Sequence, residues 1–396
     1  RPALSRRTML AGSAAAGVAA TAGCLGEESD GGGREIVDRP TVFVFNTGDG
    51  TVSLIDVESD SVVATEPIGM TASFPSNQYS PGLTDRPEAP LWLNVDDGVR
   101  AVSAGPLGEL AHVETGSGAN WQEQTPDGET LVVSAREPAH RQYRIDADRD
   151  SETFGEVTGE IDRTPEGGRG DNDGPGPCDV TIHPDGEYAY VPDLFGDTLT
   201  VIDIEAFEIV EQVDVDAADG TPPEPWMGTA AWDGERMLVE NNTGSAGTES
   251  IWDVSDPAEP VETARLGPDD GFGEGPLTSE IGPESAFGYA FTPGTADVTV
   301  VDLVAGEVAD RLDLGGSAFV GTWDPDRSKL YVPVQTAGEV AVIDSERREV
   351  VNRIEVGPEP YGATAATFRV ERDGGRDAAY SVDTLTGEYE TTYCIG

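Results

Sequence analysis

The chain of 396 residues contains few of the side chains that catalytic and metal-binding sites most often use. It has three histidines, three cysteines and a single lysine, Lys329. No two histidines stand at a metal-binding spacing, and neither a Cys-x-x-Cys-His motif nor a Gly-x-Ser-x-Gly elbow is present. We therefore expect no zinc or copper site of the usual composition. The sequence favours a protein that is not an enzyme.

Positive charge is also scarce. The chain has 24 basic and 75 acidic side chains, which gives a formal net charge of −51 at pH 7. Because there is no basic stripe to neutralise phosphates, nucleic acid is not expected as a partner. Repulsion among so many acids would destabilise a compact protein in dilute salt, whereas concentrated salt screens that repulsion. The acids are spread along the whole chain, so the composition indicates adaptation to high salt rather than a patch for a cationic partner.

The first 24 residues are interpreted as a targeting segment that is not part of the fold. The sequence SRRTML at residues 5–10 resembles a twin-arginine export signal, and TAGC at residues 21–24 resembles a lipobox. These resemblances imply export and a lipid on Cys24, which would be the protein's only attachment to the outer face of the cytoplasmic membrane. The alternative is a chance cysteine after a signal peptide. We expect residues 25–39 to form a flexible tether.

A strand cassette recurs along the rest of the chain. Its clearest copies are His183–Val215 and Asp324–Val356, each with a turn at Pro-Asp, a Tyr-Val-Pro strand, a Val-Ile-Asp strand and a final apolar alternation. A period of roughly 40 to 50 residues, with about four short strands in each copy, is typical of propeller blades. The 49 glycines and 28 prolines suit such an all-β chain with many turns.

The sequence therefore predicts an all-β fold, a seven-bladed β-propeller over residues 40–396 that ends in a C-terminal tail. The expected blades are 41–69, 89–115, 119–157, 177–215, 226–266, 285–314 and 318–356. The first blade lacks an inner strand, and Tyr361–Val370 can supply it, so that the ring closes by pairing of N- and C-terminal strands. Eight blades are the alternative, because residues 378–396 resemble one more hairpin.

The sequences YVPD at residues 190–193 and YVPV at residues 331–334, each followed by Val-Ile-Asp, resemble the YVTN-type β-propeller repeat. Blade one keeps the asparagine of that repeat as Asn46. Together with the export signal and the acidic composition, the resemblance implies an exported lipoprotein of a halophilic archaeon, similar to archaeal surface-layer and cell-surface propellers. The wider propeller group includes lactonases, haem d1-binding domains and quinoprotein dehydrogenase subunits, so the resemblance implies no particular ligand.

The longest loops between blades are predicted to share one face. They are Met70–Pro90, Thr158–Pro177, Asp216–Pro225 and Gly267–Glu284. Long loops on one face of a rigid scaffold are where binding sites usually lie. Aromatic residues at the starts of inner strands would ring the channel mouth there and stack a ligand, or else pack between the blades. They are Trp121, Trp226, Trp323 and Tyr361.

The densest basic cluster is REPAHRQYR at residues 136–144, also on the loop-rich face. Arg136, His140 and Arg141 could bind a carboxylate or phosphate there. The alternative is that these side chains form ion pairs with the abundant acids of the protein.

Two further sites are weaker hypotheses. Asp171 and Asp173, in the sequence DNDG, alternate oxygen ligands in the manner of a calcium loop, but no bidentate Glu follows at the required offset. If Cys24 carries a lipid, Cys178 and Cys394 remain as an even pair that could form a disulfide in an oxidising compartment. The sequence therefore predicts no cofactor, and calcium is the one alternative for which it offers a candidate site.

Taken together, the sequence predicts a monomeric extracellular binding scaffold that takes an unknown protein or small-molecule ligand on its loop-rich face. The alternative is an exported enzyme or redox partner of the lactonase, haem d1 or quinoprotein dehydrogenase type. A structural surface-layer component is a third reading, which the single domain and the short tether make less attractive.

Overall fold

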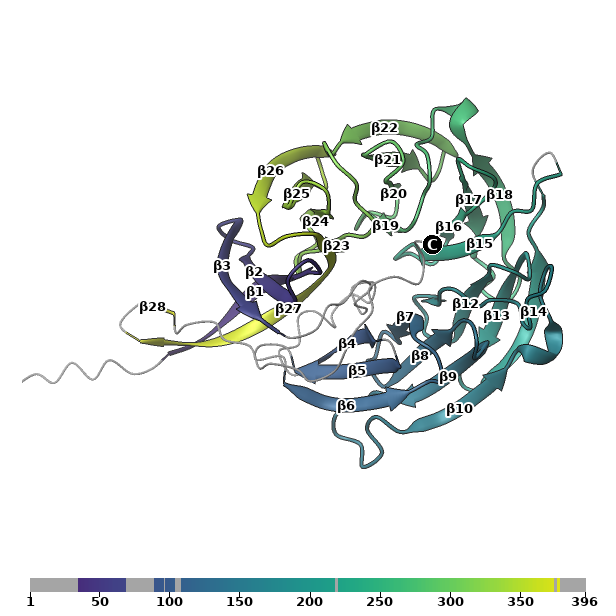
Figure 1. Ribbon diagram of the computed structural model, residues 1–396, viewed down its shortest axis with the longest axis horizontal. Helices are drawn as coiled ribbons and strands as arrows, with labels where there is room; N and C mark the ends of the chain where they lie inside the picture. The colour runs from purple at the N-terminus through teal and green to yellow at the C-terminus, as the bar shows by residue number, and fades with distance from the viewer. Residues whose placement is uncertain are drawn as a thin grey trace, which may run out of the picture.

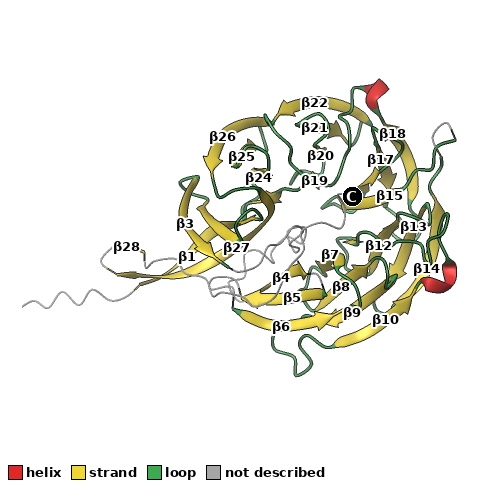
Figure 2. Ribbon diagram, viewed as in Figure 1, coloured by secondary structure: helices red, strands yellow, loops and turns green. Residues whose placement is uncertain are grey.

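The structure is a computed structural model, and it describes residues 35–68, 89–95, 97–103, 108–217, 220–373 and 376–377. These residues form seven antiparallel sheets that are arranged as blades of a ring (Figure 1). The predicted all-β fold and seven-bladed propeller are therefore confirmed. The only helices in the described part are two 3-10 turns, η1 (Thr164–Glu166) and η2 (Pro268–Asp270), so none could cross a bilayer (Figure 2).

The strands fall into blades in chain order. Blade one contains β1 (Glu35–Asn46), β2 (Thr51–Asp56) and β3 (Ser61–Pro67), joined by β27 (Pro360–Asp373) and β28 (Arg376–Asp377) from the other end of the chain. Blade two contains β4 (Pro90–Val95), β5 (Gly98–Ser103) and β6 (Glu109–Glu114). Blade three contains β7 (Ala119–Gln124), β8 (Thr130–Ala135), β9 (Arg141–Asp146) and β10 (Val157–Asp162).

The remaining four blades have four strands each. Blade four contains β11 (Thr181–Ile182), β12 (Tyr188–Asp193), β13 (Thr198–Asp203) and β14 (Glu208–Asp214). Blade five contains β15 (Pro225–Ala230), β16 (Arg236–Asn241), β17 (Thr248–Asp253) and β18 (Val261–Leu266). Blade six contains β19 (Ser279–Ile281), β20 (Phe287–Thr292), β21 (Asp297–Asp302) and β22 (Glu307–Asp313). Blade seven contains β23 (Thr322–Trp323), β24 (Lys329–Val334), β25 (Glu339–Asp344) and β26 (Glu349–Glu355).

Alternation along each middle strand builds the core between blades. In β16, Met237 and Val239 pack in one cluster with Tyr190 of blade four, whereas Leu238 packs with Ile281 of blade six. Successive side chains of a strand point to opposite faces, so a middle strand needs apolar residues on both. Outer strands such as β14 carry mostly exposed side chains, because only one of their edges and part of one face are covered.

The ring closes as predicted. β27 pairs antiparallel with β1, and Val42 lies opposite Ala365 in the register of that pair. This pairing places strands from the two ends of the chain in one sheet, so neither end leaves a long unpaired edge beside the other.

Two predicted boundaries between blades are wrong, and the predicted tether over residues 25–39 is too long. Residues 35–39 belong to β1 and pair with β27, so the propeller begins before residue 40. Blade three does not end at residue 157, because its outer strand β10 runs over Val157–Asp162. Blade six begins with β19 at Ser279 and not at residue 285. In both places short strands stood inside segments that were interpreted wholly as loops. β19 has only three residues, and β10 contains a glycine and has no buried side chain, so neither shows a clear alternation of apolar residues.

Candidate binding surface on the loop-rich face

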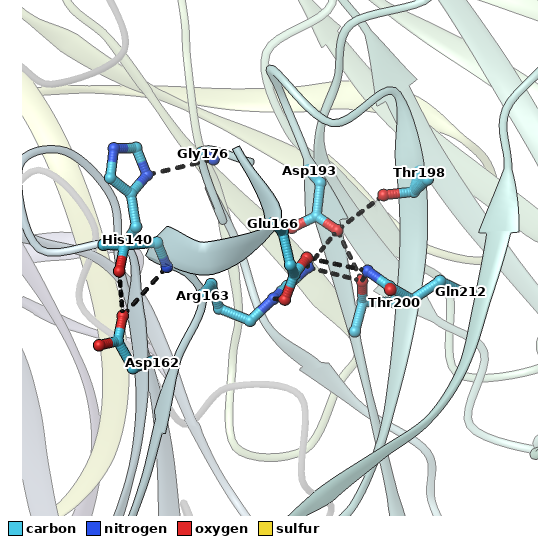
Figure 3. A network of polar contacts seen from close by, with 10 residues as sticks. His140, Asp162, Arg163, Glu166, Gly176, Asp193, Thr198, Thr200 and Gln212 are labelled. Carbon is cyan, nitrogen blue, oxygen red and sulfur yellow. Dashed lines mark hydrogen bonds and ion pairs between the residues drawn. The ribbon is translucent and has the colours of Figure 1, made fainter. Parts of the chain in front are cut away.

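The longest described loop on the predicted face is the insertion, residues 163–176, between β10 and β11. Arg163 anchors it (Figure 3). The Arg163 guanidinium is fully buried and donates hydrogen bonds from Nη2 to Asp193 at 2.9 Å and from Nε to Glu166 at 2.5 Å. Burial alone would lower the pKa of Arg163, but the two carboxylates outweigh it and hold that pKa above its usual range. The insertion therefore starts from a charged group fixed inside the protein.

The position of Asp193 explains why an arginine is needed there. The equivalent residues at the ends of β1 and β16 are Asn46 and Asn241, which donate hydrogen bonds to serine hydroxyls of the next strand at 3.0 and 2.7 Å. Asp193 instead accepts a hydrogen bond from Thr200 at 2.6 Å, and its carboxylate brings a buried negative charge. Arg163 supplies the opposite charge, which a buried carboxylate requires.

A second arginine holds the far part of the insertion against two blades. Arg169 pairs through Nη1 with Asp197 of blade four at 2.5 Å and through Nη2 with Glu224, just before blade five, at 2.6 Å. Its backbone N–H donates to the carbonyl of Phe195 at 2.7 Å. Between the insertion and blade four lies a cavity of about 570 Å³, whose lining includes Glu166, Arg169, Pro175, Phe195, Asp197 and Gln212.

The predicted basic cluster lies partly beneath the insertion. Arg136 and His140 are buried, and the imidazole Nδ1 of His140 accepts a hydrogen bond from the backbone N–H of Gly176 at 3.3 Å (Figure 3). A Cβ at Gly174 would overlap the His140 ring, so the insertion packs directly on it. Burial lowers the pKa of His140, so the ring is neutral at pH 7.

All three predicted anion-binding side chains have partners within the protein. Arg136 forms an ion pair with Glu137 at 2.6 Å, and Arg141 pairs with Glu160 and Asp162 on β10. The structure thus brings Arg136 and His140 together under the insertion, and it places Arg141 on the outer part of blade three. Anion binding by these residues stays a prediction, and it would require an anion to replace a carboxylate.

The four predicted aromatic residues divide between two apolar clusters. Trp121 and Tyr361 are buried, Trp226 is half-buried, and all three belong to one cluster, which draws residues from six blades, among them Cys178, Leu277 and Val320. Trp323 lies elsewhere, between blades six and seven, edge-on to Tyr289 with ring centroids 5.5 Å apart. Phe319, which sequence reasoning missed, stacks on Tyr361 at 4.9 Å and is also half-buried. Trp226 and Phe319 are therefore the aromatics of this set that a ligand could reach.

Buried carboxyl groups near the inner strands were also missed. Glu123 accepts a hydrogen bond from the backbone of Ile182 at 3.0 Å, and Asp179 accepts one from Gly228 at 2.7 Å. Each carboxyl group thus links its own blade to the inner strand of the next blade. Burial raises the pKa of Glu123 to about 8, and it raises the pKa of Asp179 well above its usual range. The only sign in the sequence was an acid within or beside a strand of apolar residues. That sign does not reveal which backbone groups of the next blade lie against the acid.

The remaining candidates are placed only in part. Asp171 and Asp173 are exposed in the insertion, and among the described residues no group of three or more His, Cys, Asp or Glu could hold a metal ion. Cys178 is buried at the start of blade four, whereas Cys394 and Cys24 lie outside the described residues. Calcium binding, the disulfide and lipidation all stay predictions.

No family model matches this sequence, and no curated protein matches it either. Solved structures match the fold. A periplasmic gluconolactonase of Pseudomonas aeruginosa, PpgL, has a TM-score of 0.64 at 15% identity over 84% of this chain and 99% of its own. Hydrazine synthase of Kuenenia stuttgartiensis has a TM-score of 0.60 at 18% identity over 77% of this chain and 92% of its own.

A third similar structure is the dihydro-heme d1 dehydrogenase NirN in complex with DHE. Its TM-score is 0.53 at 16% identity, over 82% of this chain and 74% of the NirN chain. At such low identities the likeness shows the fold alone. The fold, the closed ring and these matches together define the class of this protein as a seven-bladed β-propeller.

Proposed function

We propose that the chain is an exported β-propeller, anchored at the outer face of the membrane by a lipid on Cys24, that binds a protein or small-molecule ligand without catalysis. In this proposal the YVTN-like cassette builds a monomeric scaffold suited to high salt. The binding surface is the loop-rich face, centred on the insertion, with the half-buried Trp226 and Phe319 as further contacts.

The observation that supports this proposal most is the way in which the insertion is held. Two arginines tie it to the fold, one of them through a fully buried ion pair with Asp193. Taking two charges out of water has a large desolvation cost, so such a pair is weak as a device for stability alone. An ordered loop loses little further entropy when it binds, which favours affinity. A rigid insertion with an open polar cavity is therefore well suited to recognition.

The experiment compares three immobilised proteins in concentrated NaCl, with an envelope extract of the native organism as the source of ligand. They are the wild type, a variant with residues 164–175 replaced by a short Gly-Ser linker, and Arg169→Ala. We expect the wild type to enrich a specific component and both variants to lose it. Arg347→Gln, on the opposite face, is the matched control and should retain that component. The proposal fails if the wild type enriches nothing, or if the linker variant folds and still binds equally.

The second candidate function is that of a lactonase or a redox partner of the haem d1 or quinoprotein type. The observations that favour it are the fold likeness to PpgL and NirN and the titratable carboxyl groups near the inner strands. Hydrolysis of glucono-δ-lactone by the purified protein, lost in Glu123→Gln, would support this candidate over the binding scaffold.

A further inference from the structure

A second candidate site lies on the face opposite the insertion, between blades six and seven. A cavity of about 710 Å³ is lined by the β19–β20 turn, the β23–β24 turn and the β25–β26 turn. These turns stand at the strand ends away from the loop-rich face. The volume falls within the usual range for small-molecule sites. Tyr289 and Phe287 supply apolar lining, and Arg327 and Arg348 supply positive charge.

Neither arginine has a carboxylate partner among the described residues, although most of the other arginines in that part of the chain do. Each lies instead over an aromatic ring: Arg348 is 4.2 Å from the ring centroid of Phe287, and Arg327 is 4.5 Å from that of Trp232. Stacking on a ring holds the planar guanidinium in place and leaves its N–H donors available to a ligand. Trp232 is fixed in turn, because its indole N–H donates to the carbonyl of Ile281 at 2.9 Å.

Both arginines occupy backbone positions that favour glycine. Arg327 has φ +57° and Arg348 has φ +55°, in the left-handed region. The equivalent position of the turn between first and second strands is Gly128, Gly186 or Gly234 in blades three to five, each also with positive φ. The position equivalent to Arg348 in blade four is Phe207, which has φ +52°, so this turn takes a large side chain elsewhere in the fold as well. The left-handed backbone fixes the direction in which each side chain leaves its turn. Two such residues line one cavity here.

The charges around the cavity narrow the class of ligand that it could bind. Two guanidinium groups match a carboxylate, with which arginine forms paired hydrogen bonds. Four acids also line the cavity: Glu284, Asp326 and Glu346 are exposed, and Asp344 is half-buried. These acids disfavour a polyanion and can receive a cationic group. The protein's net charge of −51 likewise repels simple anions.

We propose that this cavity binds a small zwitterion of the amino-acid or short-peptide class. Its carboxylate lies between Arg327 and Arg348, its ammonium group faces the acidic rim, and an apolar side chain packs against Phe287. This site is separate from the proposed binding surface around the insertion, so either can fail without the other.

The test is calorimetric titration of the full chain in concentrated NaCl with the dipeptide Gly-Phe and with its C-terminal amide. We expect saturable binding of Gly-Phe and at least tenfold weaker binding of the amide. Arg348→Gln and Arg327→Gln should each weaken Gly-Phe binding about tenfold, since each removes one charged hydrogen-bonding group. Arg347→Gln is the matched control: that side chain is exposed, next to Arg348, and outside the cavity lining. Its ion pair with the lining residue Asp344 is long, at 3.9 Å, so binding should be unchanged.

Arg348→Gly guards against a folding artefact. Glycine suits the left-handed backbone, so this variant should unfold at or above the wild-type temperature and still lose Gly-Phe binding. The proposal is overturned if Gly-Phe does not bind, if its amide binds equally well, or if Arg347→Gln weakens binding as much as Arg348→Gln does.

Discussion

The side chains expected to affect the pH dependence of stability most are two buried acids that face one another. Glu240 and Glu249 lie directly opposite in the register of β16 and β17, and both are fully buried. Like charges at such a position destabilise a sheet, so the pair favours protonated carboxyl groups. Burial raises the pKa of Glu240 to about 7, and burial together with the charge of Glu240 raises the pKa of Glu249 well above its usual range.

Stability should therefore fall as the pH rises through this range. Below pH 4.5 both the folded and the unfolded chain hold the proton on Glu240. Between pH 4.5 and about 7 only the unfolded chain releases it, so the free energy of unfolding decreases; above about 7 this contribution is constant. In the wild type we expect the free energy of unfolding to decrease by roughly 3 kcal/mol over this range, since each pKa unit corresponds to about 1.4 kcal/mol, and we expect Glu240→Gln to abolish that decrease.

Denaturant unfolding at pH 5 and pH 8, at constant salt, measures this effect. Glu208→Gln, an exposed change of the same chemistry, controls for the general charge of the protein. Equal pH dependence in Glu240→Gln and the wild type would show that Glu240 is ionised in the folded protein.

The buried pair of Arg163 and Asp193 gives a second expectation. Arg163→Met leaves Asp193 buried without its charge partner, and we expect a loss of about 3 to 5 kcal/mol in the free energy of unfolding. Adding Asp193→Asn introduces the amide found at the equivalent positions Asn46 and Asn241, so most of the lost stability should be recovered. A double-mutant cycle by denaturant unfolding measures the coupling. A double variant no more stable than Arg163→Met would mean that the ion pair does not cause the loss.

These residues show which side-chain environments could be predicted from the sequence and which could not. Asn46 could be matched to the repeat from its neighbours alone. The partner of Asp193 could not, because Arg163 is 30 positions earlier and in what was interpreted as a loop. Glu240 likewise stands in an ordinary alternating strand, and its burial depends on what blade six places over it.

Among strands and turns, middle strands were the easiest to predict. The two clearest cassettes in the sequence contain the middle strands β12 and β13 in blade four and β24 and β25 in blade seven. Each of these strands carries apolar residues on both faces. Three inner strands, β11, β19 and β23, are short, and in β11 a contact between blades takes the place of part of the pairing, through the hydrogen bond from Ile182 to Glu123. Such strands have too few residues for a period to be visible. The two boundary errors, at β10 and β19, fall on strands with weak patterns.

The β4–β5 hairpin offers a test of one tight turn. Gly98 has φ +157°, and a Cβ there would overlap the backbone carbonyl of Val113 on β6. Since that carbonyl is backbone and cannot move aside, we expect Gly98→Ala to destabilise the protein by about 3 kcal/mol. Gly50→Ala is the control: φ is +66°, nothing lies within 4 Å, and only the left-handed backbone contributes, about 1 kcal/mol. Thermal unfolding of both variants checks this, and equal losses would contradict it.

The whole molecule is a closed ring with a large negative charge. The closure was predictable because blade one visibly lacked an inner strand and residues 361–370 could supply it. The ligand could not be predicted, because function depends on the particular side chains that individual loops and turns carry, and these differ from one blade to the next. The cavity between blades six and seven is one example, formed by turns that look ordinary in the sequence.

The charge itself gives an expectation for salt. With a net charge of −51, repulsion should lower the unfolding temperature in dilute buffer, and NaCl should raise it steadily as screening increases. Scanning calorimetry across NaCl and KCl concentrations measures this. The two salts should act alike, and a sugar at equal osmolarity should act less. An unfolding temperature independent of salt would contradict adaptation to high salt.

The central claim is that this propeller is a binding scaffold and not a cofactor-dependent enzyme. An absorption spectrum with elemental analysis, on protein purified from its native organism in high salt, tests it most directly. We expect no visible absorption band and no stoichiometric transition metal. A visible chromophore, or one transition-metal ion per chain, would contradict the claim and move attention to the inner strands and their buried carboxyl groups.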